Sequence, residues 1–168
     1  SLNWDRHRFN GGELLNKCLG IIGLGNVGHR VARYAKAFDM KVQAFDPYLA
    51  DEVFERHGVQ KVDWITLLNT SDVITFHVPL NDETRGMISE MEIERMKPGV
   101  ILLNTARGGV IDETSLLNAL HSGHVAAAGI DTWEVEPPRD NPFSQLPQVV
   151  MSPHIGASTS EAQIRIAE

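Results

Sequence analysis

Gly23-Leu24-Gly25-Asn26-Val27-Gly28 is the stretch that decides the fold of this 168-residue chain. It follows an apolar run over residues 18–22 and precedes a helix-like stretch, which is the setting of a dinucleotide-binding turn. The first glycine permits the tight turn, the second lets the backbone approach a pyrophosphate, and the third lets the helix pack on the strand. Free N–H groups at the helix N-terminus then favour an anion. Glycine clusters also occur in ordinary turns, so the pattern needs support from the rest of the sequence.

An acidic residue after the next expected strand gives that support. Residues 42–45 form a short apolar stretch that ends at Asp46-Pro47, 18 positions after Gly28. A carboxylate that binds the adenine ribose of NAD is expected at a spacing of about 20 residues. The simpler alternative is that Asp46 only caps a turn before Pro47. Because a carboxylate repels a 2′-phosphate, the sequence predicts NAD rather than NADP as the cofactor.

Apolar runs alternate with helix-like stretches along the chain. We predict strands at residues 19–23, 42–45, 73–78, 100–104, 126–130 and 149–152. We predict helices at residues 27–38, 49–57, 64–69, 89–96 and 113–122, and a last helix opened by a Ser-x-x-Glu capping box at residues 158–161. Most of these strands are continuously apolar, as in sheets buried on both faces. The sequence therefore predicts an α/β fold, a Rossmann-type doubly wound parallel sheet with ligands at the carboxyl ends of its strands.

Composition limits the class of function. The formal net charge of −7 argues against a general nucleic-acid surface, and no apolar run has the length of a membrane span. The single cysteine, Cys18, allows no internal disulfide and fits a reducing cytoplasm, where we expect it to be a small buried hydrophobe. We expect no metal site.

Polar residues follow the later strands, where a parallel sheet brings them to one edge. His154 could take a hydroxyl proton while hydride leaves the carbon, because its pKa lies near neutrality. Glu136 could orient the ring, and Arg107 could bind a substrate carboxylate or a developing oxyanion. Asp131 could accept from a nicotinamide carboxamide, with the Thr105-Ala106 backbone lining the same pocket. The simpler alternatives are a paired loop arginine, a solvated glutamate and a loop histidine with satisfied hydrogen bonds.

Taken together, these segments resemble the D-isomer-specific 2-hydroxyacid dehydrogenases. The matching segments are residues 23–28, Asp46-Pro47, His77-Val78-Pro79-Leu80, residues 104–109, Asp131 with Glu136-Pro137-Pro138, and residues 152–159. The resemblance implies that Arg107, Glu136 and His154 occupy the catalytic positions. With the fingerprint glycines, the NAD-binding positions are Gly23, Gly25, Asn26, Val27, Gly28, Asp46, Val78, Pro79, Thr84, Thr105, Ala106, Arg107, Asp131, His154, Gly156 and Ala157. One departure is Thr132-Trp133, where the family often has Val-Phe.

The resemblance also implies a domain organisation. Residues 1–168 resemble the NAD-binding domain without the substrate domain, with residues 1–16 similar to the inter-domain helix or linker and residues 158–168 to the truncated start of a return helix. We expect such a chain to bind NAD and to lack most turnover, because closure of the second domain excludes water and completes the site. The family dimerises largely through this domain, so a homodimer is expected.

Within the family, three segments most resemble members that oxidise D-3-phosphoglycerate in serine synthesis. These segments are residues 107–113, 136–140 and 154–163. Reductases of glyoxylate or hydroxypyruvate share much of this sequence and are the alternative among enzymes. A non-catalytic NAD-sensing module, like the corepressors that share this fold, is the alternative of a different class. The lack of an obvious peptide-recruitment or regulatory extension favours the enzyme.

Overall fold

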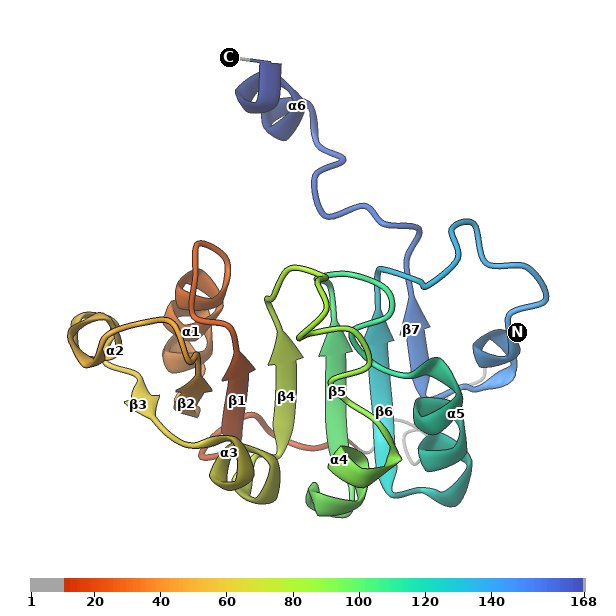
Figure 1. Cartoon of the computed structure of the whole chain (residues 1–168), viewed down its shortest axis with the longest axis horizontal. Coiled ribbons are helices and arrows are strands. Elements are labelled where there is room, and N and C mark those ends of the chain that lie inside the picture. Colours follow the sequence, from red (N-terminus) through yellow and green to blue (C-terminus); the bar gives the residue numbers. More distant parts are fainter. Residues whose placement is uncertain (1–10, 168) are drawn as a thin grey trace, which may run out of the picture.

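All strands of the sheet run parallel, in the order β3-β2-β1-β4-β5-β6-β7 (Figure 1). The computed structural model describes residues 11–167. The strands are β1 (Cys18–Ile22), β2 (Lys41–Phe45), β3 (Gln60–Lys61), β4 (Val73–Phe76), β5 (Val100–Asn104), β6 (Val125–Ile130) and β7 (Val149–Met151). The strand order reverses between β1 and β4, which is the topological switch point where such sheets bind ligands.

Helices cover both faces of this sheet. They are α1 (Gly28–Ala37), α2 (Asp51–His57), α3 (Trp64–Thr70), α4 (Glu90–Arg95), α5 (Glu113–Ser122), the 3₁₀ helix η2 (Pro142–Gln145) and α6 (Ser160–Ala167). Successive strand residues point to opposite faces, so Ile21 packs with Ala32 of α1 and Phe54 of α2. Ile22 belongs to a second core cluster with residues of α3, α4 and α5, such as Leu116. The doubly wound fold is therefore confirmed, and α6 stands away from the sheet (Figure 1).

The turn after β1 is close-packed in the way that the glycine spacing predicted. Gly23 has a φ of 89°, and a Cβ on it would lie 2.7 Å from the carbonyl oxygen of His77. A Cβ on Gly28 would lie 2.1 Å from the carbonyl oxygen of Gly23. Both distances are too short for any side chain, so α1 can begin directly against the turn only with glycine at these positions.

Several predicted boundaries are wrong by one or two residues. β1 ends at Ile22 because Gly23 already turns, and β4 ends at Phe76, three residues before Pro79, which has no N–H for a sheet. β7 ends at Met151, and α2 begins at Asp51 because Ala50 is extended. The last helix is capped by Thr159, whose Oγ1 accepts from Ala162 N at 3.1 Å, and not by a capping box at Ser158.

Two elements were not predicted. β3 has two exposed polar residues, so it carries no apolar pattern, and η2 is a single turn that starts with Pro142. Cys18 is half-buried rather than fully buried. Residues 1–10 of the expected inter-domain segment lie outside the described residues, and residues 11–17 contain no helix. Between residues 11 and 167, every helix is too short or too polar to cross a membrane.

Candidate functional site

Two cavities lie at the carboxyl edge of the sheet and contain most of the predicted site residues. The β1–β4 cavity, of about 340 Å³, includes Gly23, Gly25, Asp46, Val78, Pro79 and Thr84 in its lining. The β5–β7 cavity, of about 750 Å³, is lined by Val27, Thr105, Arg107, Asp131, His154, Gly156, Ala157, Ser158 and Gln163. The remaining predicted residues, Asn26, Gly28, Ala106 and Glu136, line neither cavity. The glycine loop joins the two, because Gly25 lines one and Val27 lines the other.

The glycine loop has the properties of a phosphate cradle. Within residues 11–167, the backbone N–H groups of Gly25, Asn26 and Val27 donate to no protein acceptor. They precede the first turn of α1, where unpaired donors and the helix dipole attract anions. A Cβ on Gly25 would meet no atom within 4 Å, so this side of the loop is open. The loop therefore fits the pyrophosphate of a dinucleotide.

Asp46 both caps a turn and lines the β1–β4 cavity. Its Oδ1 accepts from Tyr48 N at 3.0 Å, which is the turn-capping role, and its Oδ2 accepts from Leu24 N at 3.0 Å in the glycine loop. A carboxylate has about four lone-pair sites, so acceptor capacity remains toward the cavity. The two sequence-based alternatives for Asp46 are thus compatible, since the turn holds the carboxylate at the cavity.

His77 and Thr84 shape the opposite wall of this cavity. Burial lowers the pKa of His77 to about 4, so its imidazole is neutral at physiological pH. The Thr84 hydroxyl donates to Pro79 O at 2.6 Å and accepts from Asn81 N at 2.9 Å, which closes the loop after β4. This wall is therefore formed by a fixed loop and an uncharged ring.

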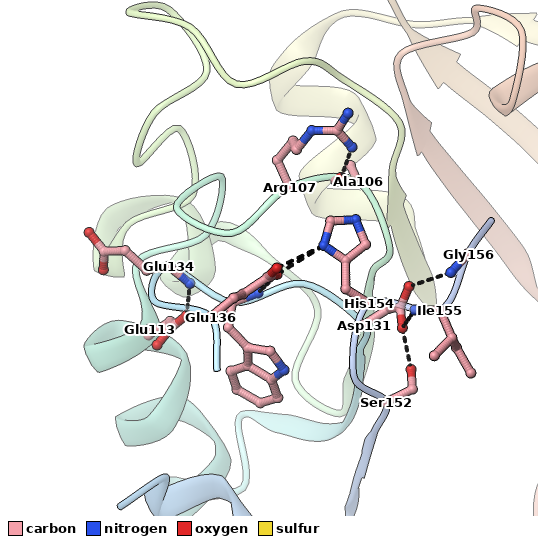
Figure 2. Close-up of polar contacts among 11 residues, drawn as sticks. Ala106, Arg107, Glu113, Asp131, Glu134, Glu136, Ser152, His154, Ile155 and Gly156 are labelled. Atoms are coloured by element: carbon pink, nitrogen blue, oxygen red, sulfur yellow. Dashed lines mark hydrogen bonds and ion pairs between the residues drawn. The ribbon is translucent and has the colours of Figure 1, made fainter. Parts of the chain in front are cut away.

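The imidazole of His154 is hydrogen-bonded to the carboxylate of Glu136 (Figure 2). Its Nδ1 lies 2.9 Å from Oε2 and 3.1 Å from Oε1. The hydrogen bond from His154, and then that from Trp133 N, lower the pKa of Glu136. Because a carboxylate only accepts, Nδ1 carries the hydrogen, and Nε2 is left to exchange a proton with a ligand.

Glu136 is itself positioned by the segment that follows β6. Its Oε1 accepts from Trp133 N at 3.0 Å, and Glu134 N donates to Glu113 Oε1 of α5 at 2.7 Å (Figure 2). Trp133 is buried and packs on Phe143 with ring centroids 5.6 Å apart. The departure at Thr132-Trp133 therefore contributes to the core beneath the site, and Trp133 lines neither cavity.

Figure 2 shows His154 between Arg107 and Glu136, and of these three residues Arg107 and His154 line the β5–β7 cavity. The loop of Arg107 is held by the buried side chain of Asn104, which donates to Arg107 O at 2.9 Å and accepts from Ala106 N at 3.1 Å. The next residue, Gly108, packs so closely that a Cβ would lie 1.9 Å from Trp133 O. Only glycine allows the arginine loop to contact the segment that carries Glu136.

Asp131 holds the loop that carries His154. Its carboxylate accepts from Ser152 Oγ at 2.6 Å, from Ile155 N at 2.9 Å and from Gly156 N at 3.2 Å (Figure 2). Burial raises the pKa of Asp131, but these hydrogen bonds outweigh it and the net pKa is lowered. His154 has a φ of 54°, a conformation few non-glycine residues adopt, and its N–H donates to Asp131 O at 2.8 Å. Asp131 thus has a role that sequence reasoning did not assign.

Sequence reasoning assigned no role to several further residues of the site. Asn104 and Ser152 support loops, Tyr48 and Glu83 line the β1–β4 cavity, and Gln163 lines the β5–β7 cavity. Asn104 and Ser152 carried a usable signal, because each is a polar residue at the end of a predicted apolar strand. Tyr48, Glu83 and Gln163 carried none, since they lie in polar surface segments.

Comparison with known proteins places this geometry in a family. The sequence profile "D-isomer specific 2-hydroxyacid dehydrogenase, NAD binding domain" matches residues 1–156. The chain is 47% identical over 167 residues to D-3-phosphoglycerate dehydrogenase of Bacillus subtilis, covering 99% of this chain and 32% of that protein. It is 49% identical over 166 residues to hydroxypyruvate reductase of Thermotoga maritima, covering 97% of this chain and 53% of that protein.

A solved structure agrees with these sequence comparisons. The crystal structure of a glyoxylate reductase from Paecilomyes thermophila matches with a TM-score of 0.88 and 40% identity, over 94% of this chain and 48% of that one. The chain thus spans a third to a half of the length of the relatives that it matches. It belongs to the D-isomer specific 2-hydroxyacid dehydrogenase family, of which it is an NAD-binding domain.

Proposed function

We propose that this domain serves the transfer of hydride between NAD(H) and a D-2-hydroxy acid or its 2-oxo acid. The observation that carries the proposal is the His154–Glu136 pair, with Arg107 and Val27 of the glycine loop lining the same cavity as His154. Gly25, Val27 and Asp46 are the residues that would hold NAD. When bound, NAD supplies the hydride acceptor or donor.

His154 is the general base in the direction of oxidation. Its Nε2 accepts the proton of the substrate hydroxyl group while hydride leaves the carbon that bears this hydroxyl. That carbon becomes the carbonyl carbon of the product. The carboxylate of Glu136 stabilises the imidazolium that forms and keeps the ring in position. In reduction the protonated ring returns the proton to the carbonyl oxygen, so one residue serves both directions.

Arg107 recognises the acid group. One guanidinium nitrogen is held by Ala106 O at 2.6 Å, which leaves other N–H groups of the planar fork free for a carboxylate or a developing oxyanion. The side chain is exposed at the cavity, so a ligand can reach it.

D-3-phosphoglycerate is the substrate that we propose. The support is the activity by which relatives such as the Bacillus subtilis D-3-phosphoglycerate dehydrogenase are named, together with the segments that resemble members acting on this acid. Hydroxypyruvate or glyoxylate is the second candidate, supported by the Thermotoga maritima and Paecilomyes thermophila relatives. All of these are 2-hydroxy or 2-oxo acids, so they make the same demand on Arg107 and His154.

Calorimetric titration with NADH and NADPH, on the wild type and the Asp46→Ala variant, tests the cofactor role first. We expect NADH to bind, the variant to bind it more weakly, and NADPH to bind poorly. Turnover in the native protein is then compared for D-3-phosphoglycerate, glycerate, lactate, glyoxylate and hydroxypyruvate. The largest kcat/KM is expected for D-3-phosphoglycerate. NADH binding without turnover of any of these acids would favour an NAD-sensing role instead.

We also propose a homodimer formed through this domain. On α1, Tyr34 is 57% exposed, and Phe38, which follows the helix, is 61% exposed. They are four positions apart and so lie on the same side of the helix, away from the buried Ala32 and Ala35. Exposed apolar side chains grouped in this way are typical of an interface.

A further inference from the structure

Two loops meet at the mouth of the β1–β4 cavity. The Tyr48 hydroxyl, in the loop between β2 and α2, donates a hydrogen bond to the Glu83 carboxylate, in the loop between β4 and α4. The backbone N–H of Tyr48 is held by Asp46 Oδ1 at 3.0 Å, and Glu83 N is held by Asn81 Oδ1 at 3.0 Å. A single residue, Tyr48, therefore links the carboxylates of Asp46 and Glu83, and all three line the cavity.

The contact persists at neutral pH because the tyrosine stays protonated. The hydrogen bond to Glu83 raises the pKa of Tyr48 above its usual value, so the hydroxyl remains a donor. Tyr48 is 74% exposed, which places the link at the solvent rim of the cavity and not in its interior.

The cavity carries negative charge with no cation to balance it. Among residues 11–167, no lysine or arginine lines it, and the one histidine, His77, is neutral. Arg85, which follows Thr84, and Lys61, which lines a neighbouring cavity with Asp46, do not line this one. Arg85 extends toward Gly109, and Lys61 forms an ion pair with Asp51 at 2.5 Å. Asp46 and Glu83 are therefore two carboxylates in the lining of this cavity that no cation of the same lining balances.

We propose that Glu83, positioned by Tyr48, is a second determinant of the preference of this cavity for NAD over NADP. The inference rests on the proposed cofactor role of the cavity. NADP differs from NAD by a 2′-phosphate, which adds negative charge on the adenosine half of the molecule. That phosphate meets the carboxylates of Asp46 and Glu83, whereas the uncharged hydroxyl of NAD meets no repulsion.

The position of Glu83 gives the effect a characteristic salt dependence. Repulsion between charges at a solvent rim is screened over a Debye length of about 8 Å at physiological ionic strength. The discrimination that Glu83 provides should therefore shrink as salt is added. Hydrogen bonds of the ribose hydroxyls should respond much less to salt, because a hydroxyl group carries no net charge.

Fluorescence titration with NADH and NADPH at low and high salt tests the proposal. Glu83→Gln removes the charge while keeping an acceptor for Tyr48. Tyr48→Phe removes only the hydroxyl that positions Glu83. Asp82→Asn is the matched control, because Asp82 is an exposed neighbour that does not line the cavity. It changes the net charge of the protein by the same amount.

We expect Glu83→Gln to tighten NADPH binding about 5- to 30-fold at low salt, as for one charge removed at close range. NADH binding should change less than about twofold, and Tyr48→Phe should shift the ratio of the two affinities in the same direction by a smaller factor. Asp82→Asn should leave the ratio unchanged. The proposal would be overturned if Glu83→Gln left the ratio of the NADH and NADPH affinities unchanged, or if Asp82→Asn shifted this ratio equally. Binding of NADH by the wild type would in either case leave the cofactor role standing. Absence of NADH binding in the wild type would overturn the cofactor role itself.

Discussion

Two carboxylates control His154 in different ways. Glu136 accepts from the imidazole, whereas Asp131 accepts from the backbone and the serine hydroxyl of the loop that carries the histidine. Substitution of Glu136 should therefore disturb the orientation of the imidazole ring. Substitution of Asp131 should disturb the position of the whole loop that carries His154. The two effects can be separated experimentally.

Glu136→Gln should impair chemistry and leave cofactor binding intact. The amide cannot stabilise an imidazolium as a carboxylate does, so we expect kcat of the native protein to fall about 10²-fold or more. Glu136 lines neither cavity, so the dissociation constant of NADH should stay within about twofold. Steady-state kinetics and NADH titration on the same preparation make the comparison. A variant with wild-type kcat would remove Glu136 from the mechanism.

Asp131→Asn should destabilise the fold in a pH-dependent way. One amide oxygen cannot replace two carboxylate oxygens, and we expect a loss of about 1–3 kcal/mol in unfolding free energy at neutral pH. The folded pKa of Asp131 is depressed below 3.8, so its contribution is complete above that value and is lost as pH falls through the folded pKa. Urea denaturation should show a constant difference in unfolding free energy between wild type and variant from pH 7 downward. This difference should narrow only below about pH 4, in measurements extended to pH 3.

The glycine loop offers a matched pair of variants at the level of one structural element. Gly25→Ala should leave the melting temperature unchanged, because the new methyl meets no protein atom within 4 Å, but it should weaken NADH binding by occupying the phosphate cradle. Gly28→Ala should lower stability by about 1–3 kcal/mol, because its methyl would lie 2.1 Å from Gly23 O. Thermal denaturation and NADH titration of both variants check this. Equal effects of the two substitutions on stability would contradict these separate roles.

Strands that are buried on both faces could be predicted from the sequence, although the ends of β1 and β4 were misplaced. β1, β4 and β5 are runs of apolar residues, and burial is the physical cause of that pattern. β3 could not be predicted, because it forms only by pairing Gln60 and Lys61 with β2 and buries neither side chain. The cap of α6 was misplaced because Ser158, Thr159 and Ser160 are all suitable caps, and only the fold selects among them.

The same distinction applies to the site. Residues at the ends of buried strands could be assigned to one edge from the sequence, because parallel topology fixes where strand ends lie. The link between Tyr48 and Glu83 could not, since it joins loops 35 positions apart through side chains alone. The hydrogen bonds between Asp131 and the loop that carries His154 could not be predicted either, because they depend on the pairing of β6 with β7.

At the scale of the whole molecule, the proposed dimer makes a testable demand on α1. Substitution of Tyr34 and Phe38 together by lysine should convert a dimer into a monomer, because charged side chains would be buried at the interface. Ile65→Lys is the control, since Ile65 is an exposed apolar residue on α3, which covers the other face of the sheet. Sedimentation equilibrium reports the mass. A monomeric wild type, or a double variant that stays dimeric, would place the interface elsewhere or remove it.

The division of the site into two cavities also determines how substitutions combine. Glu83 and Glu136 share no hydrogen-bond partner and line no common cavity among residues 11–167. The free-energy effects of substitutions at such independent positions usually add to within about 0.5 kcal/mol. The choice of coenzyme and the acid–base step are therefore separable traits of one domain. Either could change by point mutation during evolution or engineering while the other was retained.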